Sequence, residues 1–69
     1  MEVEILLNGE ARKVPGSTLL TILLEELHLD PKRIAVEYNR KLLKRENWGS
    51  TFLADGDRIE IVHFVGGGK

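Results

Sequence analysis

The residues that could do chemistry are three consecutive glycines near the end of the chain, Gly66, Gly67 and Gly68, followed by Lys69. A glycine strip has no side chains, so it fits a tunnel that any Cβ atom would block. We expect the strip to be flexible, and ordering it costs about 1–2 kcal/mol per residue, which a partner offsets through main-chain hydrogen bonds. Its useful group is a terminal carboxylate, which becomes an acyl donor after activation, for example as a mixed anhydride with AMP. The alternative interpretation is a frayed terminus without a function.

The other polar residues favour structural roles over catalysis. His63 has no serine, cysteine or carboxylate partner in the pattern, and His28 suits the end of a helix. Asp55 and Asp57 indicate a turn, because the spaced carboxylates and terminal glutamate of a calcium loop are missing. The absence of cysteine excludes thiolate catalysis, disulfides and cysteine zinc sites. The sequence therefore predicts no catalytic residue, no metal site and no free-standing enzyme.

Charge and hydropathy argue against nucleic acid and membrane as partners. Ten lysines and arginines face eleven aspartates and glutamates among 69 residues, and this near-balance supplies no basic field. A small basic cluster at 40–45 indicates a solvated sheet edge, or alternatively a surface that attracts an acidic partner electrostatically. The longest apolar runs, such as Ile5-Leu6-Leu7, fall far short of the roughly 20 residues that cross a bilayer. Together with the missing cysteines, this favours a cytoplasmic protein.

The first half of the chain predicts a hairpin followed by a helix. Apolar residues alternate with glutamates from Val3 to Leu7, and Asn8-Gly9 is a strong signal for a turn into a second strand over Glu10–Val14. Leucines at three- and four-residue spacing predict a helix from Thr18 to about His28, with a cap from Ser17 or Thr18.

The second half predicts a short hairpin and a long final strand. The expected elements are a strand at Ile34–Tyr38, a strand at Lys41–Lys44, a helical turn at Glu46–Trp48 and a strand at Arg58–Val65. The last of these is mostly apolar, which favours a central position between the two hairpins and parallel to the first strand.

This order of elements predicts an α+β fold, the ubiquitin-like β-grasp. A mixed sheet of four to five strands packs on one main helix, whereas a ferredoxin-like fold would need two helices of similar length. We expect one β-grasp domain over residues 1–65 and a flexible glycine tail over 66–69. Alternation along the final strand directs Ile59 and Ile61 to the helix, and Val62 and Phe64 to the open face, where they are candidate partner contacts or merely apolar surface.

The chain resembles the sulfur carrier proteins of thiamine (thiazole) biosynthesis over nearly its whole length. The glycine tail stands at the distance from the last strand that the family shows. The matching stretches are Gly16-Ser17-Thr18-Leu19, Leu23-Leu24, Ala35-Val36-Glu37-Tyr38-Asn39, Lys44-Arg45-Glu46-Asn47-Trp48, Asp55-Gly56-Asp57-Arg58-Ile59-Glu60-Ile61 and Val62-His63-Phe64-Val65-Gly66-Gly67-Gly68.

The resemblance implies a carrier and not an enzyme. An E1-like adenylyltransferase uses ATP to activate the terminal glycine, and a cysteine desulfurase route supplies the sulfur. Thiazole synthase then takes the sulfur from the resulting thiocarboxylate. Gly68 would carry the sulfur, or Gly67 if the tail is trimmed further, and Gly66–Gly68 would enter the partner tunnel. The chain itself binds no cofactor, since it has no glycine-rich phosphate loop. If Lys69 is native, a peptidase must expose the glycine.

Three other interpretations stay open. The small subunit of molybdopterin synthase is a related carrier, but it usually has prolines shortly before its glycines, and the stretch 61–65 has none. A ubiquitin-like modifier would form isopeptide bonds with lysines of other proteins. A TGS-type β-grasp module, which associates with RNA inside larger proteins, has no need of a free glycine terminus.

Overall fold

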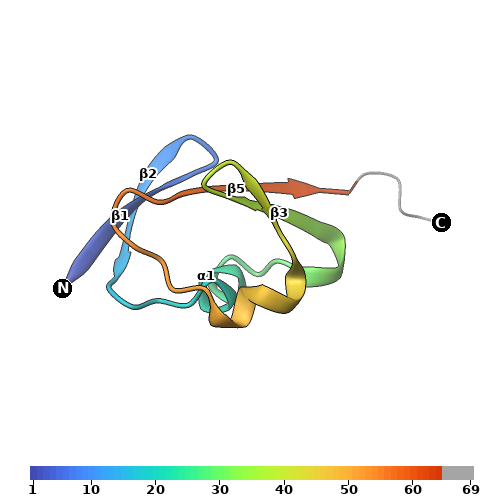
Figure 1. The fold of residues 1–69 in the computed structure, drawn as a ribbon, viewed down its shortest axis with the longest axis horizontal. Helices are drawn as coiled ribbons and strands as arrows, with labels where there is room; N and C mark the ends of the chain where they lie inside the picture. The colour runs from blue at the N-terminus through green and yellow to red at the C-terminus, as the bar shows by residue number, and fades with distance from the viewer. Residues whose placement is uncertain (65–69) are drawn as a thin grey trace.

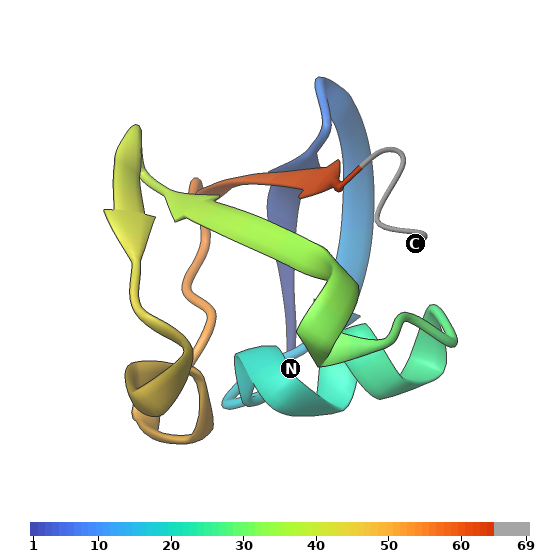
Figure 2. The ribbon, with the colours of Figure 1, turned by 90° about the vertical axis from the view of Figure 1, so that its right-hand side faces the viewer.

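A computed structural model describes residues 1–64 of the chain. A single five-stranded sheet has the order β2-β1-β5-β3-β4, and one α-helix packs against one of its faces, as Figures 1 and 2 show. The elements are β1 (Glu2–Leu7), β2 (Glu10–Pro15), α1 (Leu20–Glu26), the 3₁₀ helix η1 (Pro31–Arg33), β3 (Ile34–Tyr38), β4 (Lys41–Leu43), the 3₁₀ helix η2 (Arg45–Ser50) and β5 (Arg58–His63). The expected α+β, β-grasp fold is confirmed.

The first hairpin forms as the sequence predicts. Val3 and Ile5 are buried while their neighbours in β1 are exposed, so alternation places one side of the strand in the core. Asn8 and Gly9 have φ of 49° and 84°, the left-handed pair that a two-residue hairpin turn requires. All six residues of β1 pair with β2 in an antiparallel register.

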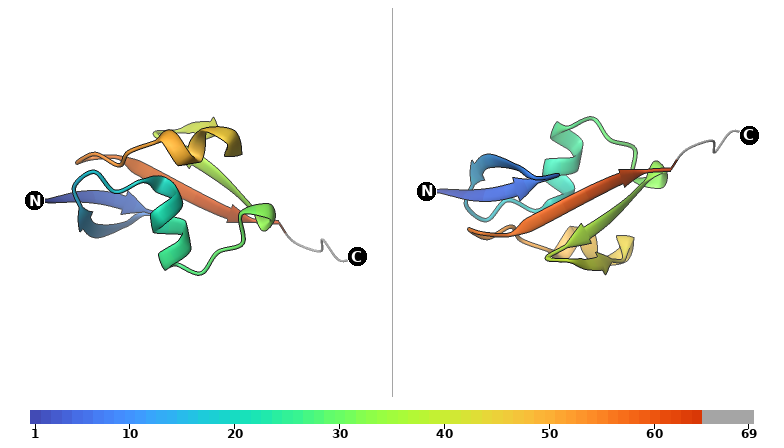
Figure 3. Two further views of the ribbon diagram at one scale, coloured as in Figure 1. Left: turned by 90° about the horizontal axis from the view of Figure 1, so that it is seen from below. Right: turned by 90° about the horizontal axis from the view of Figure 1, so that it is seen from above.

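The second hairpin and β5 complete the sheet. Asn39 and Arg40 adopt φ of 53° and 73°, so this turn has the same left-handed geometry without a glycine. β5 runs parallel to β1 and antiparallel to β3, in the centre of the sheet, as Figure 3 shows. The predicted central position of the last strand is therefore confirmed.

Several predicted boundaries are corrected. β5 ends at His63 instead of Val65, because its partner β3 begins at Ile34 directly after η1. Val65 lies outside the described residues, as does the predicted tail 66–69. β4 ends at Leu43, since the chain then turns into η2, which is longer than the predicted helical turn.

The predicted start of the helix is wrong. α1 begins at Leu20, and neither Ser17 nor Thr18 caps it. The Thr18 hydroxyl instead donates to the Pro15 carbonyl at 2.6 Å. The Leu20 amide, which needs an acceptor at the helix start, donates to the Thr51 carbonyl at 2.9 Å. A loop that is distant in sequence therefore replaces the expected side-chain cap.

The helix ends earlier than predicted, in a left-handed turn at His28. The Leu29 amide donates to the Leu24 carbonyl at 3.1 Å and the His28 amide donates to the Glu25 carbonyl at 3.0 Å. This pair of bonds is the Schellman motif, whose left-handed position usually holds glycine. His28 adopts it with φ of 59°. The spacing of the leucines predicts a helix that reaches His28, whereas the left-handed backbone at His28 ends the helix.

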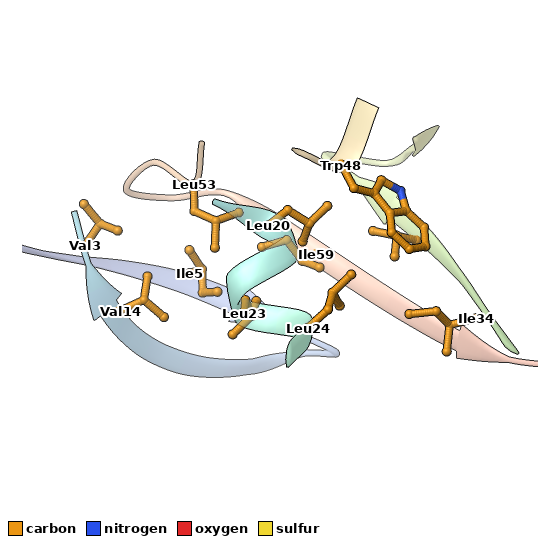
Figure 4. Close-up of a cluster of buried hydrophobic side chains, with 11 residues drawn as sticks. Val3, Ile5, Val14, Leu20, Leu23, Leu24, Ile34, Trp48, Leu53 and Ile59 are labelled. Atoms are coloured by element: carbon orange, nitrogen blue, oxygen red, sulfur yellow. The ribbon is translucent and has the colours of Figure 1, made fainter. Parts of the chain in front are cut away.

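The core lies between α1 and the inner sheet face (Figure 4). Its buried apolar side chains come from both hairpins, the helix, η2, β5 and the loop between η2 and β5. They are Val3, Ile5, Val14, Leu20, Leu23, Leu24, Ile34, Val36, Trp48, Leu53 and Ile59. Trp48 also donates from its indole nitrogen to the Leu43 carbonyl at 2.9 Å, so its one polar atom is satisfied. No helix within residues 1–64 is long and apolar enough to cross a bilayer.

Candidate functional site

Val62 and Phe64 lie where alternation along β5 predicts. Ile59 is fully buried under the helix and Ile61 packs against the core, whereas Val62 and Phe64 are each 57% exposed. The two exposed side chains therefore stand on the open face, at the end of β5 from which the chain continues to the predicted glycine tail. Gly66, Gly67 and Gly68 themselves lie outside the described residues, so their predicted role stays a prediction.

Two further apolar residues extend this surface toward β4. Ala35 lies directly opposite Val62 in the register of β3 and β5. Leu42 of β4 is 71% exposed, and Ala35 and Leu42 line the same hollow at the sheet edge. We call Ala35, Leu42, Val62 and Phe64 the open-face patch. Alternation along β5 predicts only Val62 and Phe64, because the contribution of Leu42 depends on which strands are neighbours in the sheet.

Charged residues border the open-face patch along the sheet. Glu37 and Glu60 lie opposite each other in β3 and β5. Glu60 also accepts from the Arg58 guanidinium at 3.2 Å, and both side chains are about 40% exposed. An exposed pair of this kind contributes little to stability. The same face thus combines an apolar end near residue 64 with a charged middle.

Backbone contacts to η1 hold the end of β5. The Phe64 amide donates to the Arg33 carbonyl at 2.9 Å. Asp30 caps η1 by accepting from the Lys32 amide at 3.0 Å, and its carboxylate lies 3.5 Å from the Arg33 guanidinium. Asp30, Lys32, Arg33 and Phe64 together line a surface hollow. The last described residue is therefore fixed to a capped turn.

A polar cluster fixes the opposite end of β5. Asp57 is only 8% exposed, and its carboxylate accepts from the Tyr38 hydroxyl at 2.5 Å, the Asn39 side-chain amide at 3.2 Å and the Ala54 backbone amide at 2.8 Å. Burial, and then the hydrogen bond and charge of Asp57, raise the pKa of Tyr38 to about 12. The Asn39 side chain also accepts from the Arg58 amide at 2.8 Å. The sequence pattern indicates only a turn at Asp57, because its partners Tyr38 and Asn39 are distant in the sequence.

The arrangement offers no catalytic constellation within residues 1–64. His63 is exposed on β5, and no group of three His, Cys, Asp or Glu residues could hold a metal in this part of the chain. In the basic cluster, Arg45 lies over the Trp48 ring at 6.0 Å from its centre, while Lys41 and Lys44 are exposed. What the described residues can supply is a binding surface at the end of β5.

A comparison with protein families identifies the chain. The model of the ThiS family matches residues 5–68, which includes the three glycines of the predicted tail. The chain belongs to the ThiS family. The family expected from the resemblance is thereby confirmed.

Known proteins similar to this ThiS-family chain are of two sizes. The sulfur carrier protein ThiS of Bacillus subtilis is 41% identical over 63 residues, which cover 90% of this chain and 96% of that protein. A thiazole synthase of Magnetococcus marinus is 40% identical over 67 residues, which cover 97% of this chain and 21% of that protein. The chain thus spans about a fifth of the length of that synthase.

A solved structure shares the ThiS-family fold. The crystal structure of a thiamine biosynthesis protein (ThiS) from Geobacter metallireducens superposes with a TM-score of 0.81 at 35% identity, over 96% of this chain and all of that one. The mixed sheet and single main helix described above are therefore the family architecture.

Proposed function

We propose that this chain carries sulfur as a thiocarboxylate on Gly68, or on Gly67 if the tail is trimmed, for the formation of the thiazole of thiamine. The observation that carries the proposal is the ThiS-family match, which extends through Gly68. The function is that of a carrier protein, and the chemistry of activation belongs to its partners. A cytoplasmic location is part of the proposal, in keeping with the absence of cysteine.

The proposed loading of the terminal glycine proceeds in two steps. An E1-like adenylyltransferase joins the glycine carboxylate to the α-phosphate of ATP, and pyrophosphate leaves. Sulfide, released from the persulfide of a cysteine desulfurase route by a thiol reductant that becomes a disulfide, then attacks the acyl carbon, and AMP leaves with the electron pair of the broken C–O bond. The resulting thiocarboxylate donates its sulfur to thiazole synthase. Neither step needs a nucleotide site in this chain.

The described residues support this role through the open-face patch. Val62 and Phe64 lie within six residues of Gly68 in the sequence, so an enzyme that holds the tail must also approach them. Their exposed apolar surface gives such an enzyme a contact whose burial is favourable. The similar proteins are named as a thiazole synthase, a sulfur carrier protein ThiS and a thiamine biosynthesis protein, which favours this branch over a molybdopterin carrier, a protein modifier or an RNA-associated module.

Intact-mass spectrometry tests the proposal directly. The chain ending at Gly68 is incubated with the activating enzyme of its own organism, ATP and a sulfur donor. The expected product is heavier by the exchange of one oxygen for sulfur. A chain ending at Gly66 is the matched control, because it keeps β5 and the open-face patch but loses the proposed site. An unchanged mass for the chain ending at Gly68, with an activating enzyme that loads another carrier, would overturn the proposal.

A matched pair distinguishes the two possibilities for Lys69. The chain that retains Lys69 presents lysine, not glycine, at its carboxyl end, so we expect no loading until a peptidase removes it. Loading of the chain with Lys69 in place, located by fragmentation to Lys69, would refute the assignment of Gly68.

A further inference from the structure

The two neighbouring strands, β1 and β3, pair with β5 over different lengths. β3 pairs with five residues of β5, from Ile59 to His63, whereas β1 pairs only with Arg58 and Ile59. The reason is the turn at Asn8, which diverts the chain into β2 just as β5 continues. The second half of β5, in the centre of the sheet, therefore has an edge without a neighbouring strand.

The Asn8 side chain prolongs the β1 ladder by one bond. The backbone amide of Asn8 donates to the Ile59 carbonyl at 2.9 Å, as expected for a parallel neighbour. The Ile61 amide would next bond to the Asn8 backbone carbonyl, but it donates to the Asn8 side-chain oxygen at 2.7 Å. A side chain thus replaces a strand at the point where the main chain turns away.

The next pair of polar groups on this edge is open. The backbone amide of Asn39 donates to the Arg58 carbonyl, and the backbone amide of Phe64 donates to the Arg33 carbonyl. The even-numbered residues of this segment therefore direct their backbone polar groups toward β3. Ile61 and His63 therefore direct theirs toward β1. Within residues 1–64 the Ile61 carbonyl and the His63 amide have no hydrogen-bond partner. We call these two groups the open rung.

We propose that the enzyme accepting the sulfur adds an extended segment of its own chain to β5 at the open rung. An N–H of that segment donates to the Ile61 carbonyl, and a C=O accepts from the His63 amide. This inference rests on the proposed function and names how its partner docks. Strand addition of this kind uses main-chain hydrogen bonds for affinity and alternate side chains for specificity.

Two observations favour the sulfur-accepting enzyme as the occupant. The open rung lies within seven residues of Gly68 in the sequence, so the enzyme that receives the glycine is brought to this edge. In addition, the Magnetococcus marinus thiazole synthase contains a stretch similar to 97% of this chain, so both parts share one polypeptide there. An added strand would also place alternate side chains beside Val62, next to the open-face patch.

Amide hydrogen exchange on the unmodified chain gives the first test. Thiazole synthase purified from the same organism is added, and exchange at His63 is compared between the free and bound chain by NMR. Burial of this amide in a new hydrogen bond should slow its exchange by about tenfold or more. The Phe64 amide, already bonded to Arg33, is the internal reference. Unchanged exchange at His63 in a saturated complex would overturn the proposal.

A matched pair of variants gives the second test. His63→Pro removes the amide proton, while His63→Ala removes the imidazole and keeps the proton. Proline is tolerated on a strand edge whose N–H faces outward, so we expect His63→Pro to fold. It should bind the synthase about tenfold more weakly than His63→Ala, the loss of one main-chain hydrogen bond. Equal affinity of the two folded variants would contradict the proposal.

The outcomes separate this inference from the proposed function. Loading of Gly68 depends on the activating enzyme and is measured by mass without the synthase. A chain that is loaded but shows neither protection nor loss of affinity at His63 keeps the function and refutes the docking mode. A chain that is never loaded refutes the function. Should His63→Pro fail to fold, hydrogen exchange on the unmodified chain still decides the docking mode.

Discussion

Replacing Tyr38 by phenylalanine tests the polar cluster that fixes the start of β5. The Tyr38 hydroxyl donates to the Asp57 carboxylate at 2.5 Å, and the carboxylate also accepts from Asn39 and Ala54. Tyr38→Phe removes one donor oxygen and keeps the ring. Because Asp57 retains its other two hydrogen bonds, the variant isolates a single bond to a buried charge.

The size of the effect follows from that bond. A hydrogen bond to a charged acceptor contributes about 1.5–3 kcal/mol. Tyr38 is only partly buried, so solvent competes for its hydroxyl and the lower end of that range applies. We expect Tyr38→Phe to lower the free energy of unfolding by about 1.5 kcal/mol at neutral pH, measured by urea denaturation with the fluorescence of Trp48, the only tryptophan.

The difference between native and variant chains should depend on pH. Burial, with the hydrogen bond and charge of Asp57, raises the pKa of Tyr38 from 10.0 to about 12 in the folded chain. A raised pKa means that folding favours the protonated form. The stabilisation is therefore complete below the unfolded pKa and is lost as pH rises through the folded pKa. The advantage of tyrosine over phenylalanine should shrink between pH 10 and pH 12.

Two readouts check this reasoning independently. Tyr38 is the only tyrosine, so the ultraviolet absorbance of tyrosinate reports its titration directly, in water and in urea. Urea unfolding of both chains at neutral pH and midway between the two pKa values gives the stability difference. Other groups titrate in both chains and cancel in that difference. A native titration near the unfolded pKa, or a stability difference independent of pH, would refute the role assigned to Asp57.

Three further substitutions probe the core, the helix end and the open-face patch. Leu23→Ala removes a fully buried side chain from the centre of the core and should cost about 2–5 kcal/mol, which urea unfolding measures; a smaller loss would mean that the core repacks. His28→Gly relieves a left-handed residue and should raise stability by roughly 0.5 kcal/mol, visible as a higher melting temperature; a decrease would reveal a stabilising contact of the imidazole. Phe64→Ser changes an exposed side chain, so melting should be unchanged while affinity for the activating enzyme or the synthase falls; unchanged affinity for both would remove Phe64 from the proposed contacts.

Local patterns in the sequence were sufficient for the strands and for the faces of β5. Alternation in β1 and the Asn8-Gly9 turn determine the first hairpin without help from the rest of the chain. The same alternation correctly separates buried Ile59 from exposed Val62 and Phe64. These predictions succeed because strand periodicity is a property of consecutive residues.

Features that depend on distant segments were not predictable. The helix begins at Leu20 because the Thr51 carbonyl accepts its amide, and no local pattern shows which loop will lie there. The role of Asn8 at Ile61 likewise requires β1 to lie beside β5 and to end before it. Both cases are tertiary interactions that replace a local rule, capping in one and strand pairing in the other.

The contacts along β5 suit the proposed role, in which the strand presents its end to other proteins. Asp57 and Asn39 hold its first residue through side-chain hydrogen bonds, and Ile59 anchors it in the core. Beyond Ile61 its side chains are exposed and one edge carries only the Asn8 side chain. Because the buried half supplies the stability, the exposed half is free to exchange water for a partner without loss of the fold. Binding at this end therefore draws on surface that folding has left unused.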